Sequence, residues 1–337
     1  MSKGLILSTI NELRAEELRV WVATAEGPLI IVDGIDFSVR GGTVHGLAGE
    51  SGSGKSISAQ ALLGLQADVM VREGQITLHG RDIGQLSKAK QREIRGTEIA
   101  IVFQDPMTSL HPMISIGRQL TEHMRRGLGM GRAEANRRAV ELLEEVRIPN
   151  PKASLSAYPH QFSGGMRQRV AIAMALAGDP SVLIADEPTT ALDVTVQAGI
   201  LRLLRRLCEE HNLAVILITH DLGVMSAVTD ELTIMYAGRI VESGPTQTVL
   251  RQPRHPYADE LIKALPRAHG SVEGVRLASI EGDPATPKSR PPGCAFHPRC
   301  PYALPSCKVG VPQLLEMEAQ HLAACPVDPL PEKRGAA

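Results

Sequence analysis

The sequence predicts an α/β fold with a mainly parallel core sheet, an N-terminal antiparallel β region, a helical insertion and a small cysteine-containing C-terminal extension. Three observations favour this class. Short aliphatic runs alternate with helix-forming segments, which is typical of a parallel sheet covered by helices. A glycine-rich loop joins one of these runs to a helix. Aromatic residues are scarce (Trp 1, Tyr 4, Phe 4), so the core must be mainly aliphatic, as in parallel strands.

Size and charge narrow the class of protein. The chain has 337 residues, which favours one large domain with a smaller appendage. Its net charge of -1 gives no overall field for nucleic acid, so we expect no nucleic-acid partner. No apolar run approaches the ~20 residues of a membrane helix. Residues Met1–Ile10 do not resemble a secretory signal, so we expect a cytoplasmic protein.

The first predicted elements form a β region and a strand–loop–helix unit. Leu18–Val39 is expected to form short strands broken by Gly27 and Gly34. Thr43–Ala48 then predicts a buried strand, and Ile57–Leu65 predicts a helix. The N-terminal dipole of that helix would face any anion held by the loop between them.

This loop fits the P-loop pattern. It reads Gly49-Glu50-Ser51-Gly52-Ser53-Gly54-Lys55-Ser56. The glycines let backbone N–H groups surround phosphates, Lys55 reaches the outer phosphates, and the Ser56 hydroxyl coordinates magnesium. A chance match to so short a pattern is the alternative, and the further motifs below argue against it.

The remaining core elements follow in an α/β rhythm interrupted by helices. Ile99–Phe103 predicts a strand, and residues from about 105 to 178 predict a mostly helical insertion. Within the insertion, an i, i+3, i+4, i+7 stripe is formed by Ala139, Leu142, Leu143 and Val146. The rhythm resumes with strand Val182–Ala185, helix Thr195–Glu210, strand Ala214–Thr219 and strand Leu232–Tyr236.

Two carboxylates end one of these strands. Asp186 and Glu187 follow Val182–Ala185, and ligands of open α/β sheets bind at the carboxyl ends of strands. Asp186 would hold magnesium directly or through water, and Glu187 would orient and polarise the attacking water, since phosphoryl transfer needs mainly positioning and charge stabilisation. A helix cap or surface acid pair is the alternative, against which the apolar strand and the P-loop argue.

A third motif lies between the other two. Phe162-Ser163-Gly164-Gly165-Met166 precedes an apolar helical run, so Ser163 is expected to cap a helix whose small glycines expose backbone N–H groups to an anion. Ser-Gly-Gly alone would be a loop. With the P-loop and the acid pair in this order, the chain resembles an ABC transporter ATPase subunit. That family's signature commonly reads Leu-Ser-Gly-Gly-Gln, and Phe162 and Met166 replace its ends here.

The resemblance implies further site residues. Gln104 resembles the Q-loop glutamine, which senses the γ-phosphate, contributes to the magnesium site and touches membrane subunits. Ala191-Leu192-Asp193 resembles the D-loop, and His220 resembles the switch histidine that contacts the γ-phosphate. The resemblance therefore implies ATP and Mg²⁺ as cofactors, with nucleotide contacts that extend through Ile57. It also implies that catalysis is carried out by Glu187, His220, Gln104 and Lys55.

The resemblance also implies an assembly at the cytoplasmic face of the cell membrane, to which this chain would bind peripherally. Two ATPase subunits of this family dimerise head to tail, so Ser163, Gly164 and Gly165 would act on the partner's ATP. ATP binding closes the dimer and hydrolysis reopens it, a population shift between two arrangements. The implied partners are a second, related ATPase subunit, two membrane permease subunits and an external solute-binding protein.

An aromatic residue for the adenine is harder to assign. In the family it lies about one strand upstream of the P-loop, where this chain has Val22, with Trp21 one residue earlier. Successive strand side chains point to opposite faces, so this offset matters. Trp21 is the candidate that stacks on adenine, and packing of Trp21 against the β region is the alternative.

The end of the chain resembles the extension of one importer branch. His255-Pro256-Tyr257 and the run from Gly293 to Pro301 resemble the C-terminal extension of oligopeptide, dipeptide and nickel importers. We therefore expect an ATPase domain over 1–250, an extension over 251–337, and ATP-driven uptake of dipeptides or oligopeptides. The alternatives are uptake of nickel or another small solute, a soluble non-transport ABC ATPase, and a nucleotide-binding regulator that does not hydrolyse ATP.

Cysteines gather in the extension. Cys208 lies on an apolar helix face, where packing is its expected role. In a cytosolic protein clustered cysteines favour a metal before a disulfide, but the spacing lacks the C-x-x-C pairs of zinc ribbons. Related branch members hold a 4Fe-4S cluster, which requires four thiolates. The resemblance thus implies a cluster, with zinc or free thiols as alternatives, at Cys294, Cys300, Cys307 and Cys325.

Overall fold

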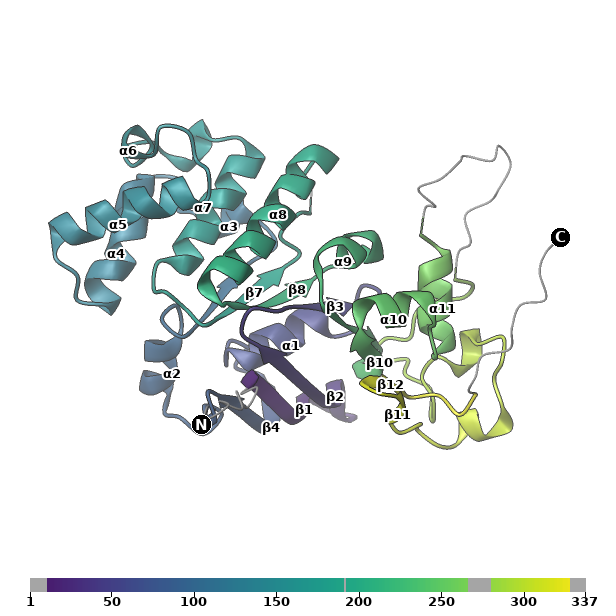
Figure 1. The fold of residues 1–337 in the computed structure, drawn as a ribbon. Helices are drawn as coiled ribbons and strands as arrows, with labels where there is room; N and C mark the ends of the chain where they lie inside the picture. Colours follow the sequence, from purple (N-terminus) through teal and green to yellow (C-terminus); the bar gives the residue numbers. More distant parts are fainter. Residues whose placement is uncertain (1–10, 191, 266–279, 328–337) are drawn as a thin grey trace, which may run out of the picture. The chain divides into compact units, whose positions relative to one another are not determined.

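A computed structural model of the chain describes residues 11–190, 192–265 and 280–327 (Figure 1). The chain forms two units. The first comprises Met1–Glu16, Asp36–Thr43 and Gly74–Ile216, and the second comprises Glu17–Ile35, Val44–Glu73 and Leu217–Ala337. The expected boundary near residue 250 is a different division of the chain and stays a prediction.

The N-terminal β region consists of longer strands than expected. Strands β1 (Asn11–Thr24), β2 (Gly27–Arg40), β4 (Met70–Leu78) and β5 (Arg81–Asp82) form a sheet in the order β2-β1-β4-β5. The prediction of short strands broken at Gly34 was wrong, because β2 continues through this residue. Gly34 has φ 63°, a conformation that glycine accepts without strain and that therefore need not end a strand.

The first unit contains parallel strands made of buried aliphatic residues. β6 (Ile99–Val102) pairs in parallel with β7 (Val182–Asp186), with Ile99 opposite Val182. β8 (Ala214–Ile218) follows α8 (Val194–His211), and the N–H of Ala214 donates to Ser181 O over 2.9 Å. Every residue of β7 and β8 is buried, as expected of strands covered on both faces.

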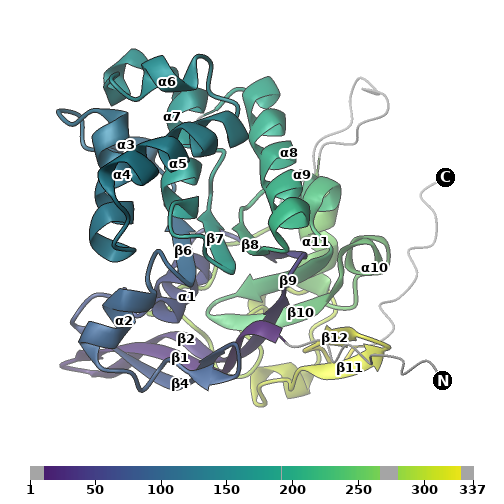
Figure 2. The ribbon, with the colours of Figure 1, turned by 60° about the vertical axis from the view of Figure 1, so that its left-hand side comes forward.

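The middle stretch of the first unit is helical, as predicted. After α2 (Lys88–Ile94), the chain forms α3 (Pro106–Ser109), α4 (Ile116–Gly127), α5 (Arg132–Glu145), α6 (Pro151–Ser154) and α7 (Gly164–Leu176). Helices α4 to α7 gather together in Figure 2, where α5 contacts α4, α6 and α7. The predicted stripe is confirmed, since Ala139, Leu142, Leu143 and Val146 are each 0% exposed.

The second unit joins the P-loop strand to the C-terminal part of the chain. β3 (Val44–Ala48) pairs in parallel with β9 (Glu231–Tyr236), and β9 pairs antiparallel with β10 (Arg239–Pro245). Two further antiparallel strands, β11 (Leu315–Glu318) and β12 (His321–Ala323), extend the order to β11-β12-β10-β9-β3. The extension therefore adds strands to the same sheet that carries the P-loop.

Helices of the second unit are short. They are α1 (Lys55–Leu62), α9 (Leu222–Val228), α10 (Thr246–Arg251) and α11 (Pro256–Lys263). Three aromatic rings form the core beside α11. The ring centroids of Tyr236 and Tyr257 lie 4.5 Å apart, and Phe296 lies 5.3 Å from each. Three of the chain's nine Phe, Trp and Tyr residues thus meet where the extension packs.

Membrane-spanning helices were not expected. Among residues 11–190, 192–265 and 280–327, none of the helices combines the length and apolar character needed to cross a bilayer.

Candidate active site

The glycines of the P-loop are required by the backbone. The loop connects the end of β3 at Ala48 to the start of α1 at Lys55. Gly49 has φ 146°, and a Cβ there would lie 2.2 Å from Met235 O. Gly54 precedes α1 with φ 102°. Side chains rarely adopt these conformations, so glycine is needed to bring the loop close to its neighbours.

Lys55 folds back over this loop. Its ammonium group donates to Gly49 O over 2.7 Å, to Glu50 O over 2.9 Å and to Ser53 Oγ over 3.2 Å. The residue is only 6% exposed. Ser56 and Ile57 are half-buried in the first turn of α1. A buried cation beside a helix N-terminus is an arrangement that attracts phosphate.

The predicted carboxylates lie in the first unit together with Gln104. Asp186 ends β7 and is 6% exposed. Glu187 Oε2 accepts two hydrogen bonds of 2.9 Å, one from Gln104 Nε2 and one from Thr190 Oγ1. The structure thus brings Gln104 and Glu187 together. Sequence reasoning missed Thr190, whose only signal is its place three residues after Glu187.

The signature and the D-loop also meet in the first unit. Ser163 caps α7, its Oγ accepting from the N–H of Met166 over 3.3 Å. Asp193 caps α8, its Oδ1 accepting from the N–H of Val196 over 2.9 Å. A Cβ on Gly165 would lie 2.4 Å from Val196 Cγ1, so the start of α7 touches α8 directly. Ala191 of the D-loop lies outside the described residues.

His220 belongs to the second unit, as does the P-loop. It follows β8 and is exposed. The next residue, Asp221, caps α9 by accepting from the N–H groups of Gly223 and Val224. The predicted residues are therefore divided, with the P-loop and His220 in one unit and Gln104, Asp186, Glu187, the signature and Asp193 in the other.

Trp21 lies on β1 and lines an open pocket of about 680 Å³. Its indole Nε1–H donates to Glu73 Oε1 over 3.1 Å. The other lining residues come from β1 and β2, except Glu73, which lies on β4. The lining of this pocket includes no residue of the P-loop. The structure therefore shows Trp21 bonded to Glu73, and stacking of Trp21 on adenine stays a prediction.

The four cysteines of the extension influence one another electrostatically. Burial raises the pKa of the Cys325 thiol to about 12, and the charges of Cys300, Cys294 and Cys307 add to this effect. Burial also raises the pKa of Cys294 and Cys300. The N–H of Cys294 donates to Cys307 O over 2.8 Å. The four thiols therefore belong to one locality of the fold.

The iron-sulfur cluster stays a prediction that rests on the number of cysteines in the extension. Four thiolates are the ligand set of a 4Fe-4S cluster, and a cluster spans more space than one ion. No group of three or more His, Cys, Asp and Glu side chains in the described part of the chain is close enough to hold a single metal ion. Cys208 is separate, being 0% exposed on α8 with its thiol donating to Leu213 O, which confirms its packing role.

A buried polar cluster anchors the extension to β10. The Glu242 carboxylate accepts from the N–H groups of Arg254 and His255 over 2.9 Å and 2.7 Å, and from His321 Nε2 over 2.8 Å. Burial raises the pKa of Glu242, although these bonds oppose the shift. Burial also lowers the pKa of His255 to about 3, so this imidazole is neutral. Its Nδ1 caps α11 by accepting from the N–H of Tyr257.

Comparisons with known families agree with the motifs. Residues 32–190 match the family described as ABC transporter. Residues 241–307 match the family described as oligopeptide/dipeptide transporter, C-terminal region.

Individual relatives cover nearly the whole chain. The oligopeptide transport ATP-binding protein OppD of Salmonella typhimurium is 46% identical, over 94% of this chain and 95% of that protein. AppD of Bacillus subtilis, also an oligopeptide transport ATP-binding protein, is 41% identical over 95% and 97%. The dipeptide transport ATP-binding protein DppD of Escherichia coli is 44% identical over 90% and 92%.

Solved structures support the fold. The ATP-binding cassette MJ0796, solved as a dimer in a post-hydrolysis state with ADP and Pi, is 26% identical with a TM-score of 0.62. The match covers 69% of this chain and 98% of that one. CbiO1 from Clostridium perfringens, part of the ABC transporter complex CbiONQ, is 28% identical with a TM-score of 0.61 and covers 72% and 91%.

Proposed function

Because the chain belongs to the ABC transporter family, as an ATPase subunit with an oligopeptide/dipeptide-type C-terminal region, we propose that it drives uptake of dipeptides and oligopeptides across the cytoplasmic membrane. The observation that carries the proposal is the full-length similarity to subunits named for oligopeptide and dipeptide transport.

The P-loop binds the phosphates of ATP in this proposal. Backbone N–H groups of the loop and of the first turn of α1 face the anion, and nucleotide contacts extend from Gly49 to Ile57. Lys55 exchanges its bonds to the loop carbonyls for bonds to phosphate oxygens, since charge-assisted bonds to phosphate are the stronger ones. Ser56, Asp186 and Gln104 are the residues that would hold Mg²⁺, which neutralises charge on the phosphates when bound.

Glu187 prepares the attacking water. Its carboxylate accepts bonds from Gln104 and Thr190, which fix the position of one carboxylate oxygen, and the group would orient the attacking water. In this proposal His220 would contact the γ-phosphate. Phosphoryl transfer gains most of its rate from such positioning and from charge stabilisation.

The signature acts on a partner's nucleotide. Ser163, Gly164 and Gly165 lie at the start of α7, where free N–H groups favour an anion. The contact between Gly165 and Val196 connects this helix start to α8, which the D-loop residue Asp193 caps. Closure of two ATPase subunits around ATP would therefore move signature and D-loop together.

This subunit would work as a membrane-associated part of a larger importer. The proposed partners are a second, different ATPase subunit, two permease subunits and an external solute-binding protein, with this chain at the cytoplasmic face. The cargo would be selected by the binding protein and the permeases, and nucleic acid has no part in the cycle.

The extension would hold a 4Fe-4S cluster through Cys294, Cys300, Cys307 and Cys325, with zinc as the alternative. The support is their number and the hydrogen bond from the Cys294 N–H to Cys307 O, which brings two of them together. Anaerobic purification followed by analysis of iron, acid-labile sulfide and zinc tests this. Four irons and four sulfides per chain would support a cluster. One zinc would favour the alternative, and none of the three would reject both.

Uptake by cells lacking this subunit tests the transport function. Labelled dipeptides, oligopeptides and nickel are supplied after complementation with either the intact chain or Lys55→Ala. We expect peptide uptake only with the intact chain, because the variant loses the ammonium that binds phosphate. Uptake of nickel alone would replace peptides as the cargo, and no response to any cargo would contradict the proposal.

A further inference from the structure

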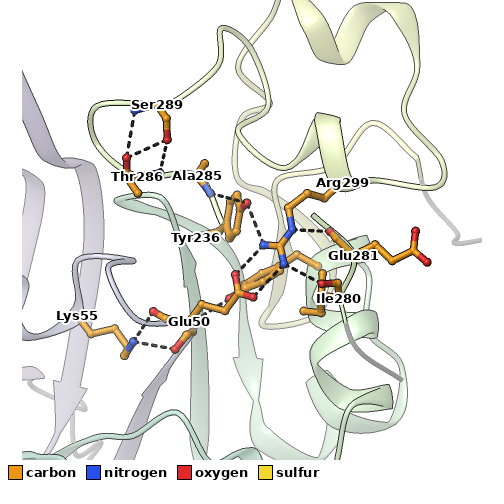
Figure 3. A network of polar contacts seen from close by, with 11 residues as sticks. Glu50, Lys55, Tyr236, Ile280, Glu281, Ala285, Thr286, Ser289 and Arg299 are labelled. Carbon is orange, nitrogen blue, oxygen red and sulfur yellow. Dashed lines mark hydrogen bonds and ion pairs between the residues drawn. The ribbon is translucent and has the colours of Figure 1, made fainter. Parts of the chain in front are cut away.

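The second residue of the P-loop, Glu50, has bonds that lead out of the loop. Its N–H donates to the Tyr257 hydroxyl over 2.8 Å. Its carboxylate accepts from Arg299, with Nη1 to Oε2 at 2.8 Å and Nη2 to Oε1 at 3.1 Å. Figure 3 shows this fork between the two side chains. These two partners of Glu50, Tyr257 on α11 and Arg299, both come from the part of the chain after the ATPase motifs.

Every guanidinium nitrogen of Arg299 donates a hydrogen bond. Nε donates to Glu281 O over 2.9 Å, Nη2 also reaches Ile280 O at 3.4 Å, and Nη1 also reaches the Tyr236 hydroxyl at 3.2 Å. Its guanidinium lies within 6 Å of the ring centres of Tyr236 (5.9 Å) and Phe296 (5.7 Å). The side chain is only 5% exposed. Such a set of bonds holds the cation in one position, as the rigid fork of arginine allows and a lysine ammonium does not.

Arg299 stays protonated and therefore positively charged. Burial alone would lower the pKa of its guanidinium, but the bonds to Glu50 and Tyr236 raise it above its ordinary value. The Glu50 side chain is 25% exposed. The pair therefore neutralises a carboxylate that would otherwise sit, partly buried, on a loop that must accept polyphosphate.

Glu50 also connects directly to the lysine of the loop. Its carbonyl accepts from Lys55 Nζ over 2.9 Å and from the N–H of Ser53 over 3.2 Å. One residue thus carries a bond to Arg299 on its side chain and bonds to the phosphate-binding turn on its backbone. A shift of the carboxylate would move the carbonyl that Lys55 and Ser53 share.

We propose that Arg299 is a positioning residue for ATP binding, which holds and neutralises Glu50 so that the P-loop can accept the phosphates. The proposal rests on the P-loop being the ATP site. It gives the extension a part in the ATPase cycle, in addition to any role of its cysteines.

The test measures Mg-ATP binding and hydrolysis by the purified full chain, in the variants Arg299→Ala, Arg299→Lys, Glu50→Gln and Arg299→Ala/Glu50→Gln. We expect Arg299→Ala to weaken ATP affinity about 10- to 100-fold, chiefly through KM. Arg299→Lys should be intermediate, since it keeps the charge without the fork. The double variant should recover much of the affinity, because it no longer carries the uncompensated carboxylate.

A matched control comes from the same region. Arg254 pairs with Glu318, its side chain being 17% exposed. Neither this ion pair nor the backbone bond of Arg254 to Glu242 involves the P-loop, so Arg254→Ala should leave ATP affinity within about twofold. Thermal unfolding of each variant identifies any that fails to fold.

Two results would overturn the positioning role: ATP affinity of folded Arg299→Ala within twofold of the unaltered chain, or no recovery in the double variant. Failure of the unaltered chain to bind ATP, or undiminished binding by Lys55→Ala, would instead overturn the assignment of the P-loop.

Discussion

Glu187 occupies an unusual backbone conformation at the end of β7. Its φ is 47°, which is uncommon for a residue other than glycine. Such conformations persist where neighbours fix them, and they cluster at functional sites. Here Gln104 and Thr190 both bond to the carboxylate, so the side chain is fixed as well as the backbone. This residue is therefore prepared for its role before any ligand arrives.

We expect Glu187→Gln to slow ATP hydrolysis about 100- to 10,000-fold, because an amide cannot accept the proton of the attacking water. ATP binding should survive, since the amide keeps an oxygen for its two donors. Measurement of phosphate release and of retained nucleotide checks both parts. Thr190→Val, which removes one donor and leaves the carboxylate, should cost only about tenfold. Hydrolysis by Glu187→Gln at the unaltered rate would contradict the assigned role.

Single residues differed in how well the sequence revealed them. Glu187 could be predicted from its place near the end of an aliphatic strand, because ligands of open α/β sheets bind at the carboxyl ends of strands, whereas Gln104 was predicted from the family resemblance. Thr190, Tyr257 and Arg299 could not be predicted. Tyr257 and Arg299 contact residues more than 200 positions away in the sequence, and the bond of Thr190 depends on the rotamer of its side chain. Neither kind of contact produces a periodic pattern of residue types that the sequence would show.

At the scale of elements, the start of α7 is constrained by α8. A Cβ on Gly165 would meet Val196 Cγ1 at 2.4 Å, whereas one on Gly164 would meet Leu192 Cδ2 at an ordinary 3.4 Å. We expect Gly165→Ala to destabilise the chain by about 1–3 kcal/mol, as overpacking does. The matched change Gly164→Ala should stay within about 0.5 kcal/mol. Thermal unfolding compares the two, and equal midpoints would contradict the close contact of α7 with α8.

The N-cap of α11 should make stability depend on pH. The pKa of His255 is lowered to about 3 by burial, so the folded state binds fewer protons than the unfolded state below the ordinary value of 6.5. The stabilising effect is complete above pH 6.5 and is lost as pH falls toward 3. Between pH 6.5 and 5 the loss amounts to about 2 kcal/mol.

His255→Asn isolates this effect. Asparagine is a good N-cap and does not titrate, so urea unfolding of the variant should lose less stability between pH 6.5 and 5. Glu242, which bonds to the His255 N–H, is shared by both proteins. The raised pKa of Glu242 has the opposite effect on stability, since its contribution to the free energy of unfolding is lost as pH rises. Because both proteins contain Glu242, this contribution cancels when their pH dependences are compared. Identical slopes for the two proteins would refute the assignment.

Elements with strong periodicity were predictable, and edge strands were not. The buried strands β3, β7 and β8 and the stripe of α5 were identified because aliphatic spacing specifies them. β11 and β12 are short and partly exposed. The alternation of apolar and polar residues in them is therefore too brief to be recognised in the sequence. The length of β1 and β2 was also missed, since a glycine such as Gly34 is ordinarily a sign of interruption.

In the proposed function the whole molecule carries only half of each reaction site, because its signature would act on a partner's ATP. We expect affinity-tagged Glu187→Gln, isolated from its native cells with Mg-ATP, to carry one copy of a different ATPase and two permease subunits. Native mass spectrometry of the detergent-solubilised complex gives the composition. A complex with two copies of this chain and no second ATPase would refute the heterodimer.

The bond between Glu50 and Arg299 spans 249 positions of sequence and has an evolutionary consequence. An extension of this kind could be acquired or exchanged by recombination only together with a compatible P-loop, since an ancestor with one charge and not the other would carry an uncompensated ion beside its nucleotide. The two segments should therefore share one history, and phylogenies built separately from the P-loop region and from the extension should branch in the same order.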